Sequence, residues 1–214
     1  MSTRKDVKRY KLRPLHKPDV AVISQWFESL EDLSLFDRSM RVPIDKDSAE
    51  KSWLEQTTNN GGNSKCWFAV EHKPEDICGI VGLEAISPIN GDAVLAIFIA
   101  ENYRKKGIAI RAAALALDLA FNQLRLNRVS SFYRADNQAS RQLTQQVGFR
   151  KEGCHRKAWF TGGKYLDMVS VGLLSSEWSK HRQTLAAQLS GDTIVQFGRG
   201  GPGDWSWPPQ AKVD

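Results

Sequence analysis

A short basic segment with one glycine lies near the middle of the 214-residue chain, Arg104-Lys105-Lys106-Gly107-Ile108-Ala109. The apolar run before it, residues 93–100, has the length and β-branched content of a buried strand. After it, apolar residues recur at helical spacing as far as residue 124. A helix N-terminus presents N–H groups without acceptors, and a glycine lets a ligand approach the main chain. The segment therefore predicts a phosphate-binding turn, with a helix start and solvated lysines as the alternative.

Two common phosphate-binding patterns are absent from this segment. No Lys-Ser or Lys-Thr pair follows the glycine at P-loop spacing, and the glycines of a dinucleotide-binding turn are missing. Within the predicted helix, the few polar residues should form one narrow polar edge. They are Arg111, Asp118, Asn122 and Arg125.

A second, shorter helix is predicted further along the chain. Residues 128–134 have the pattern of a strand, and Asp136-Asn137 then offers an N-cap. The helix should end at Gly148, as a C-cap glycine would end it. Two short motifs lie within this region, Asn137-x-x-Ser140 and Val147-Gly148-Phe149.

Together these motifs resemble those of the GNAT acetyltransferase superfamily. Arg-x-x-Gly-x-Ala after a strand is similar to the family's diphosphate loop, and the two later motifs match its Asn-x-x-Ser and Gly-Phe marks. Glu152-Gly153 and residues 163–167 resemble the terminal hairpin of the branch that acetylates ribosomal-protein N-termini, polyamines and amino sugars. The resemblance covers residues 7–178, and we expect residues 1–178 to form one acyl-CoA N-acyltransferase domain.

The resemblance implies where acetyl-CoA would bind as co-substrate, without a metal. In the family, the fourth and fifth strands splay apart to admit the pantetheine arm, and fourth-strand main-chain groups hold it. The residues implied for that role are Ile97, Phe98 and Ile99. The diphosphate would lie over Arg104, Lys105, Lys106, Gly107, Ile108 and Ala109, and Asn137 would face the pantetheine.

The catalytic acid and base are less well marked. Many family members have a tyrosine seven residues after the asparagine, as the acid for the leaving thiolate, but this chain has Thr144. Tyr133 could substitute or could belong to the core. Glu84 interrupts an apolar strand, where a carboxylate can be tuned as a base, although a solvated glutamate explains it equally well. Asp92 is a second candidate base, but its position in a turn explains it better. Asp167 is expected to stabilise the terminal hairpin.

The element pattern predicts an α/β fold with a mixed sheet and one crossover helix. The expected strands are residues 7–15, 65–71, 77–86, 93–100 and 128–134, followed by the terminal hairpin. Two helices should lie between the first two strands, one capped by Asp19 and one by Asp45 or Asp47. The loop 33–43 carries no periodicity and, with the hairpin, should contact the acceptor.

Composition indicates an ordinary globular chain, with 41% hydrophobic and 25% charged residues. There is no apolar run of the ~20 residues that a membrane span needs, and the basic N-terminus lacks the apolar core of a signal peptide. The three cysteines suit buried positions in a reducing cytoplasm, and the four histidines lack metal-ligand spacing. The net charge of +6 occurs without a nucleic-acid-binding motif, so it predicts a solvated surface or attraction of a polyphosphate or acidic partner.

The last part of the chain, residues 179–214, is expected to be an extension that is helical at first and then flexible. Its glycine-rich stretch cannot hold regular structure. Trp205 and Trp207 raise the alternative that the tail docks on its own subunit or on a partner, and the sequence leaves a homodimer open.

These features predict an acetyl-CoA-dependent N-acetyltransferase that works by direct transfer in a ternary complex. Holding an alkylamine neutral at pH 7 costs about 4.6 kcal/mol, whereas a chain N-terminus costs about 1 kcal/mol. The acceptor stays open between a protein N-terminus and a small amine such as an amino sugar or a polyamine. A non-catalytic acyl-CoA-binding or scaffold protein and a nucleic-acid-binding module are the alternatives from other classes.

Overall fold

The computed structural model describes residues 7–37, 46–54, 64–198 and 205–209. The helices in these ranges are α1 Lys17–Trp26, α2 Leu30–Phe36, α3 Lys46–Leu54, α4 Ile108–Asp118, α5 Gln138–Val147 and α6 Ser175–Gln188. The strands are β1 Lys8–Pro14, β2 Ser64–Lys73, β3 Asp76–Ser87, β4 Asp92–Ile99, β5 Arg128–Arg134, β6 Arg150–Thr161, β7 Lys164–Leu174, β8 Thr193–Phe197 and β9 Ser206–Trp207.

All the described strands join one mixed sheet in the order β6-β7-β5-β4-β3-β2-β1-β8-β9. The β4–β5 and β1–β8 pairs are parallel, and the other pairs are antiparallel. The predicted α/β fold with a mixed sheet is confirmed. The structure adds α2, which lies in the segment without periodicity, and the strands β8 and β9.

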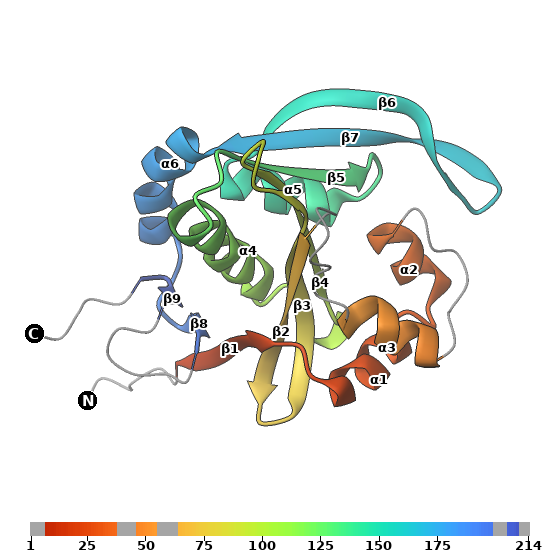
Figure 1. The fold of residues 1–214 in the computed structure, drawn as a ribbon, viewed down its shortest axis with the longest axis horizontal. Helices are drawn as coiled ribbons and strands as arrows, with labels where there is room; N and C mark the ends of the chain where they lie inside the picture. The colour runs from red at the N-terminus through yellow and green to blue at the C-terminus, as the bar shows by residue number, and fades with distance from the viewer. Residues whose placement is uncertain (1–6, 38–45, 55–63, 199–204, 210–214) are drawn as a thin grey trace, which may run out of the picture.

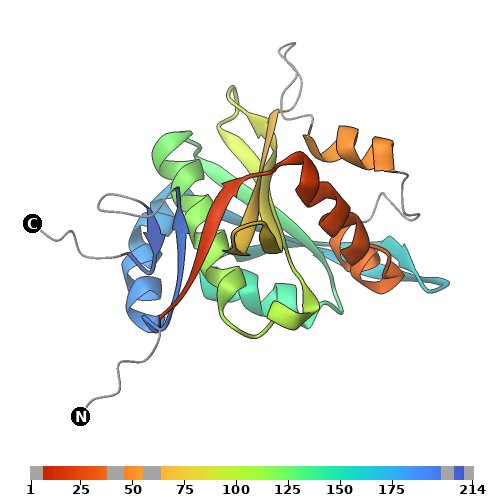
Figure 2. The same cartoon turned by 90° about the horizontal axis from the view of Figure 1, so that it is seen from below.

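Helices cover the sheet on both faces (Figures 1 and 2). On one face, α4 packs against β3 and β4, and the core there includes Leu83, Leu95 and Leu115. On the other face, α1 and α2 pack over a second core that includes Ile80 and Phe98. Because successive strand residues point to opposite faces, each central strand supplies both cores.

A buried ion pair fixes the start of α1. Arg13 donates to both carboxylate oxygens of Asp19 at 2.7 and 2.9 Å, and the His16 amide donates to the same carboxylate at 2.7 Å. The N-cap is His16, three residues before the predicted cap, and Asp19 stabilises the helix start from the third helical position. Burial alone would raise the pKa of Asp19, yet these hydrogen bonds hold it below its ordinary value. Arg13 is buried, so it is an exception to the solvated surface predicted for the basic residues.

The C-terminal segment differs from the flexible tail that composition suggested. Helix α6 runs through the predicted boundary at residue 178, β8 then pairs with β1, and β9 pairs with β8. Trp207 is fully buried, so it docks on its own subunit. The glycine-rich residues 199–204 lie outside the described part of the chain.

Two other expectations need correction. The predicted polar edge extends past α4, where Asn122 and Arg125 are exposed, but Arg111 and Asp118 within α4 are buried because the C-terminal segment covers them. The cysteines were expected to be buried. Cys78 is buried and Cys66 is half-buried, whereas Cys154 lies exposed on the edge strand β6.

Candidate active site

The parallel strands β4 and β5 separate after only three residue pairs. Asp92–Val94 pair with Arg128–Ser130, and beyond this point the two strands diverge. A cavity of about 1020 Å³ lies along the opening. The Ser131 hydroxyl donates to the Leu95 carbonyl at 2.9 Å where the splay begins. The splay predicted from the sequence is therefore present, and it opens onto a cavity large enough for an extended ligand.

The open edge of β4 offers main-chain groups to this cavity. Strand alternation places those of Ile97 and Ile99 on the same edge as the Leu95 carbonyl. The Ile99 carbonyl accepts from Arg104 Nε at 2.9 Å. The main chain of Phe98 faces β3 instead, since a Cβ added to Gly79 would lie 2.6 Å from the Phe98 carbonyl oxygen. Of the three residues that the sequence predicted, Phe98 therefore contributes its side chain to the cavity wall, not its main chain.

The basic turn adopts the expected helix start. Gly107 is the N-cap of α4, with φ +70° in the left-handed region. A Cβ at this position would meet Arg111 Nη1 at 2.4 Å, so glycine is required both by backbone conformation and by space. Gly107, Ile108 and Ala109 line the cavity, and the first-turn N–H groups lack intrahelical acceptors. This geometry fits an anionic group such as a diphosphate.

The three basic side chains of the turn are placed differently. Arg104 donates to Asp32 at 2.8 Å, which links the turn to α2. Lys106 donates to the Asn102 carbonyl at 2.6 Å and is not one of the cavity-lining residues, which argues against its predicted direct role. Lys105 is exposed, has φ +60° and lines the cavity.

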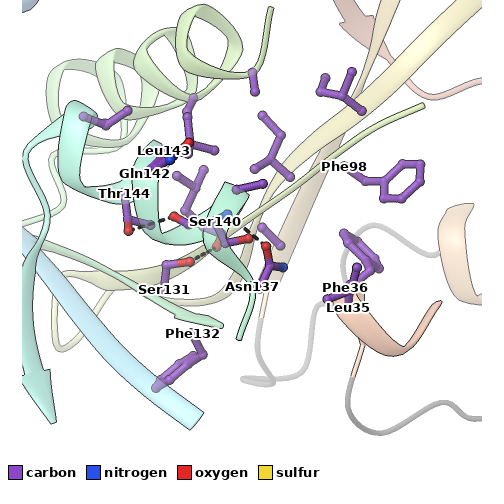
Figure 3. Close-up of a pocket in the computed structure, with 18 of the residues that line it drawn as sticks. Leu35, Phe36, Phe98, Ser131, Phe132, Asn137, Ser140, Gln142, Leu143 and Thr144 are labelled. Atoms are coloured by element: carbon purple, nitrogen blue, oxygen red, sulfur yellow. Dashed lines mark hydrogen bonds between the residues drawn. The ribbon is translucent and has the colours of Figure 1, made fainter. Parts of the chain in front are cut away.

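The second motif forms another wall of the cavity (Figure 3). Asn137 caps α5, and its side-chain oxygen accepts from the Ser140 amide at 3.0 Å. Both residues line the cavity. Thr144, at the family's tyrosine position, donates its hydroxyl to the carbonyls of Ser140 and Arg141 at 2.9 and 3.1 Å. Its hydroxyl is thus directed into its own helix.

The residues considered as catalytic acid or base differ in whether they line the cavity. Tyr133 is buried in the core and does not line the cavity, as its core interpretation predicted. Glu84 lines the cavity, and its Oε1 accepts from Trp67 Nε1 at 3.2 Å. Asp92 lies at the turn that begins β4, and Asp167 accepts from the Lys157 amide at 2.9 Å within the hairpin. Glu84 is the only one of these three carboxylates that lines the cavity.

Helix α2 forms the remaining wall, although its residues show no helical periodicity. Figure 3 shows Leu35 and Phe36 across the cavity from α5. The Ser34 hydroxyl accepts from Arg134 at 3.0 Å, and the Ser34 carbonyl accepts from the Trp159 indole at 2.9 Å. These contacts tie α2 to β5 and β6 on the far side of the splay. Residues 38–43 of the predicted acceptor loop lie outside the described part of the chain.

The described residues form no metal site and no membrane-spanning helix. Among residues 7–37, 46–54, 64–198 and 205–209, no group of three or more His, Cys, Asp or Glu side chains could hold a metal ion. No helix in those same ranges is long and apolar enough to cross a membrane.

Comparison with known families gives one match over most of the chain. The family model described as "Acetyltransferase (GNAT) domain" matches residues 9–150. A putative ribosomal N-acetyltransferase from Bacillus subtilis is 32% identical over 102 residues, which are 48% of this chain and 56% of that protein. Spermidine N(1)-acetyltransferase from Vibrio cholerae is 28% identical over 159 residues, which are 73% of this chain and 82% of that protein.

Solved structures agree with the sequence matches. A crystal structure of spermidine N-acetyltransferase from Vibrio cholerae in complex with CoA and spermine has a TM-score of 0.70 and 25% identity. It covers 79% of this chain and 98% of the solved chain. A dodecameric form of a Vibrio cholerae spermidine N-acetyltransferase has a TM-score of 0.67 over 79% of this chain and 95% of its own.

Proposed function

The chain belongs to the GNAT acetyltransferase family, and we propose that it transfers the acetyl group of acetyl-CoA to a small alkylamine of the polyamine type, by direct attack in a ternary complex. The proposal rests on one cavity, because part of its wall suits an anion and another part suits a cation. The start of α4 at Gly107 suits the diphosphate of acetyl-CoA. Elsewhere the same cavity is lined by carboxylates and aromatic rings, which suit a cationic amine. They are Asp37, Glu84, Phe36, Phe132 and Trp159.

The residues of the chain take separate parts in this reaction. Acetyl-CoA supplies a thioester carbonyl that an uncharged amine can attack. The Ile97 main chain on the open edge of β4 is placed to hold the pantetheine arm, and Asn137 lies on the facing wall. Glu84, directly or through one water, removes the proton of the amine. The Thr144 hydroxyl is engaged by its own helix, so we assign it no part in proton transfer.

The amine chemistry explains why a base is needed. An alkylamine has a pKa near 10.4, so at pH 7 deprotonation costs about 4.6 kcal/mol unless the site assists. Glu84 is a carboxylate at the cavity wall that can provide this assistance. The spermidine acetyltransferases among the relatives support the polyamine class, because they match across most of both chains.

A protein N-terminus is the second candidate acceptor. The Bacillus subtilis protein named as a putative ribosomal N-acetyltransferase favours it, although the match covers about half of each chain. A chain N-terminus has a pKa near 8 and needs little help from a base. The two acceptor classes therefore predict different pH profiles.

A panel of acceptors tests the proposal. CoA-thiol release is measured from pH 6 to pH 10 with spermidine, glucosamine and a peptide that begins with alanine. We expect spermidine to give the largest kcat/KM. A larger value for the peptide, with little dependence on a base, would assign the chain to protein N-termini. If the protein binds CoA normally but releases no thiol with any amine, it is a non-catalytic acyl-CoA-binding protein.

The proposal extends to location and assembly. A reducing cytoplasm suits the free cysteines of the described residues. A homodimer stays a prediction of the sequence, and the dodecamer describes only the Vibrio cholerae relative.

A further inference from the structure

Helix α4 carries two buried charged side chains that the cavity does not use. Arg111 and Asp118 are 3% and 4% exposed, and they lie seven residues apart, on the same side of the helix. Both are engaged by the C-terminal segment. Arg111 Nη2 donates to the Ser190 carbonyl at 2.6 Å, and Asp118 accepts from Trp207 at 2.7 Å. Residues far beyond the matched family domain thus hold the helix that begins at the diphosphate turn.

Arg111 also reaches back to the turn itself. Its Nη1 donates to the Gly107 carbonyl at 2.9 Å. One guanidinium therefore bridges the N-cap of α4 and the start of the segment that leads into β8. Because the Gly107 carbonyl and the following N–H belong to one rigid peptide plane, this bond restrains the direction of the first N–H group of the helix.

The charge of Arg111 is poorly compensated by the protein. Within the described ranges, its Nε has no hydrogen-bond partner. Burial lowers the pKa of this guanidinium, and Asp192 at longer range partly offsets that effect. A buried cation next to the helix N-terminus raises the positive potential where an anion would sit.

We propose that Arg111 is a positioning residue for acetyl-CoA, which orients the Gly107 turn, adds positive potential behind the diphosphate position, and is itself held by the C-terminal segment at Ser190. This inference rests on the proposed function. It assigns the C-terminal segment a role in co-substrate affinity, which the family-level resemblance does not include.

The test compares full-length variants. Arg111→Met keeps much of the side-chain bulk and removes the charge and both hydrogen bonds. The KM for acetyl-CoA and the calorimetric Kd for CoA should rise about tenfold, while kcat and the KM for the amine stay within twofold. Arg111→Lys keeps the charge but can reach only one of the two carbonyls, so it should restore part of the loss, with a KM about threefold above the parent. If Arg111→Met does not fold, Arg111→Lys alone decides, and a KM equal to the parent's would overturn the proposal.

Trp207→Phe is the control for general loosening of the segment. It removes a hydrogen bond to Asp118 and leaves Arg111 untouched, so it should lower the melting temperature without changing CoA affinity. Three results contradict the inference: parental affinity in Arg111→Met, a fall in kcat at unchanged KM, or an equal affinity loss in Trp207→Phe. A parent protein that neither binds CoA nor releases CoA thiol would instead refute the proposed function.

Discussion

The indole N–H of Trp207 donates to the carboxylate of Asp118 at 2.7 Å, across 89 positions of the chain. The same carboxylate accepts from the Trp178 indole at 3.0 Å and from two nitrogens of Arg182 at 2.8 Å each. A buried carboxylate is costly unless it is fully hydrogen-bonded. Here the C-terminal helix and strands supply all of these donors, so the last part of the chain belongs to the same core as α4.

Removing one of these donors should therefore destabilise the protein. Trp207→Phe keeps an aromatic ring but removes a buried hydrogen bond to a charged group, which is worth about 2 kcal/mol. For a chain of this size we expect the melting temperature to fall by roughly 4–8 °C. Scanning calorimetry checks this value. Trp205→Phe is the matched control, because Trp205 is half-buried and its indole has no acceptor within the described residues. Equal melting temperatures for both variants would mean that the bond to Asp118 contributes little.

The diphosphate turn gives a second prediction. Gly107→Ala adds a Cβ at φ +70°, where it would meet Arg111 Nη1 at 2.4 Å. The backbone strain costs about 1 kcal/mol, and the added Cβ displaces the Arg111 guanidinium that bonds the Gly107 carbonyl. We expect the calorimetric Kd for CoA to rise at least tenfold. Gly107→Glu, which also places a negative charge at the diphosphate position, should abolish binding.

Gly162→Ala is the control that distinguishes the effect of backbone strain from disruption of the diphosphate turn. Gly162 also has a positive φ, +54°, but a Cβ there would meet nothing within 4 Å. This variant should lose a similar amount of stability and keep parental CoA affinity. CoA affinity that is normal in Gly107→Ala would remove the turn from the proposed binding site.

The cysteines should differ in their reactivity. Burial raises the pKa of the Cys78 thiol to about 12 and also raises that of Cys66. Since the thiolate is the reactive form, Cys78 should resist alkylation in the native protein at pH 8. Cys154 is exposed and should react first. Mass spectrometry after brief iodoacetamide treatment should find Cys154 modified, with Cys66 and Cys78 modified only after denaturation. Early modification of Cys78 would show that β3 opens readily.

Much of this fold was predictable because its signals are local. The apolar run of β4, the basic turn at Gly107 and the two caps of α5 each depend on neighbouring residues, and each was predicted correctly. Helix α2 is seven residues long, which is too short for a periodic pattern to be distinguished.

The parts that were missed depend on distant contacts. Arg111 looked like a surface residue because its partner, Ser190, lies 79 positions away. Trp159 lies in the cavity wall just after a register shift between His155 and Trp159 in the β6–β7 pairing, and such a shift changes which face of the sheet a side chain meets. The sequence also could not show which main-chain groups of β4 face the cavity and which face β3. The direction of the Phe98 main chain, for example, depends on its pairing with β3.

The role of Glu84 is the most demanding prediction. Glu84→Gln keeps the size of the side chain, and its amide oxygen can still accept from Trp67 Nε1, but it cannot take a proton. If Glu84 is the base, turnover should fall by roughly 10²–10⁴-fold with the Kd for CoA nearly unchanged. The loss should shrink as the assay pH rises toward the pKa of the amine, since the solution then supplies the neutral nucleophile.

Asp92→Asn provides the matched control for this pH profile. It makes the same carboxylate-to-amide change on the adjacent strand, at a residue that does not line the cavity, and it should stay within twofold of the parent at every pH. Glu84→Gln turnover within twofold of the parent across the same range would mark Glu84 as a solvated side chain. A loss that is constant with pH and accompanied by a lower melting temperature would instead mark a carboxylate that supports the fold through Trp67. Glu84 is the base only if the loss of turnover in Glu84→Gln depends on pH while the affinity for CoA stays unchanged.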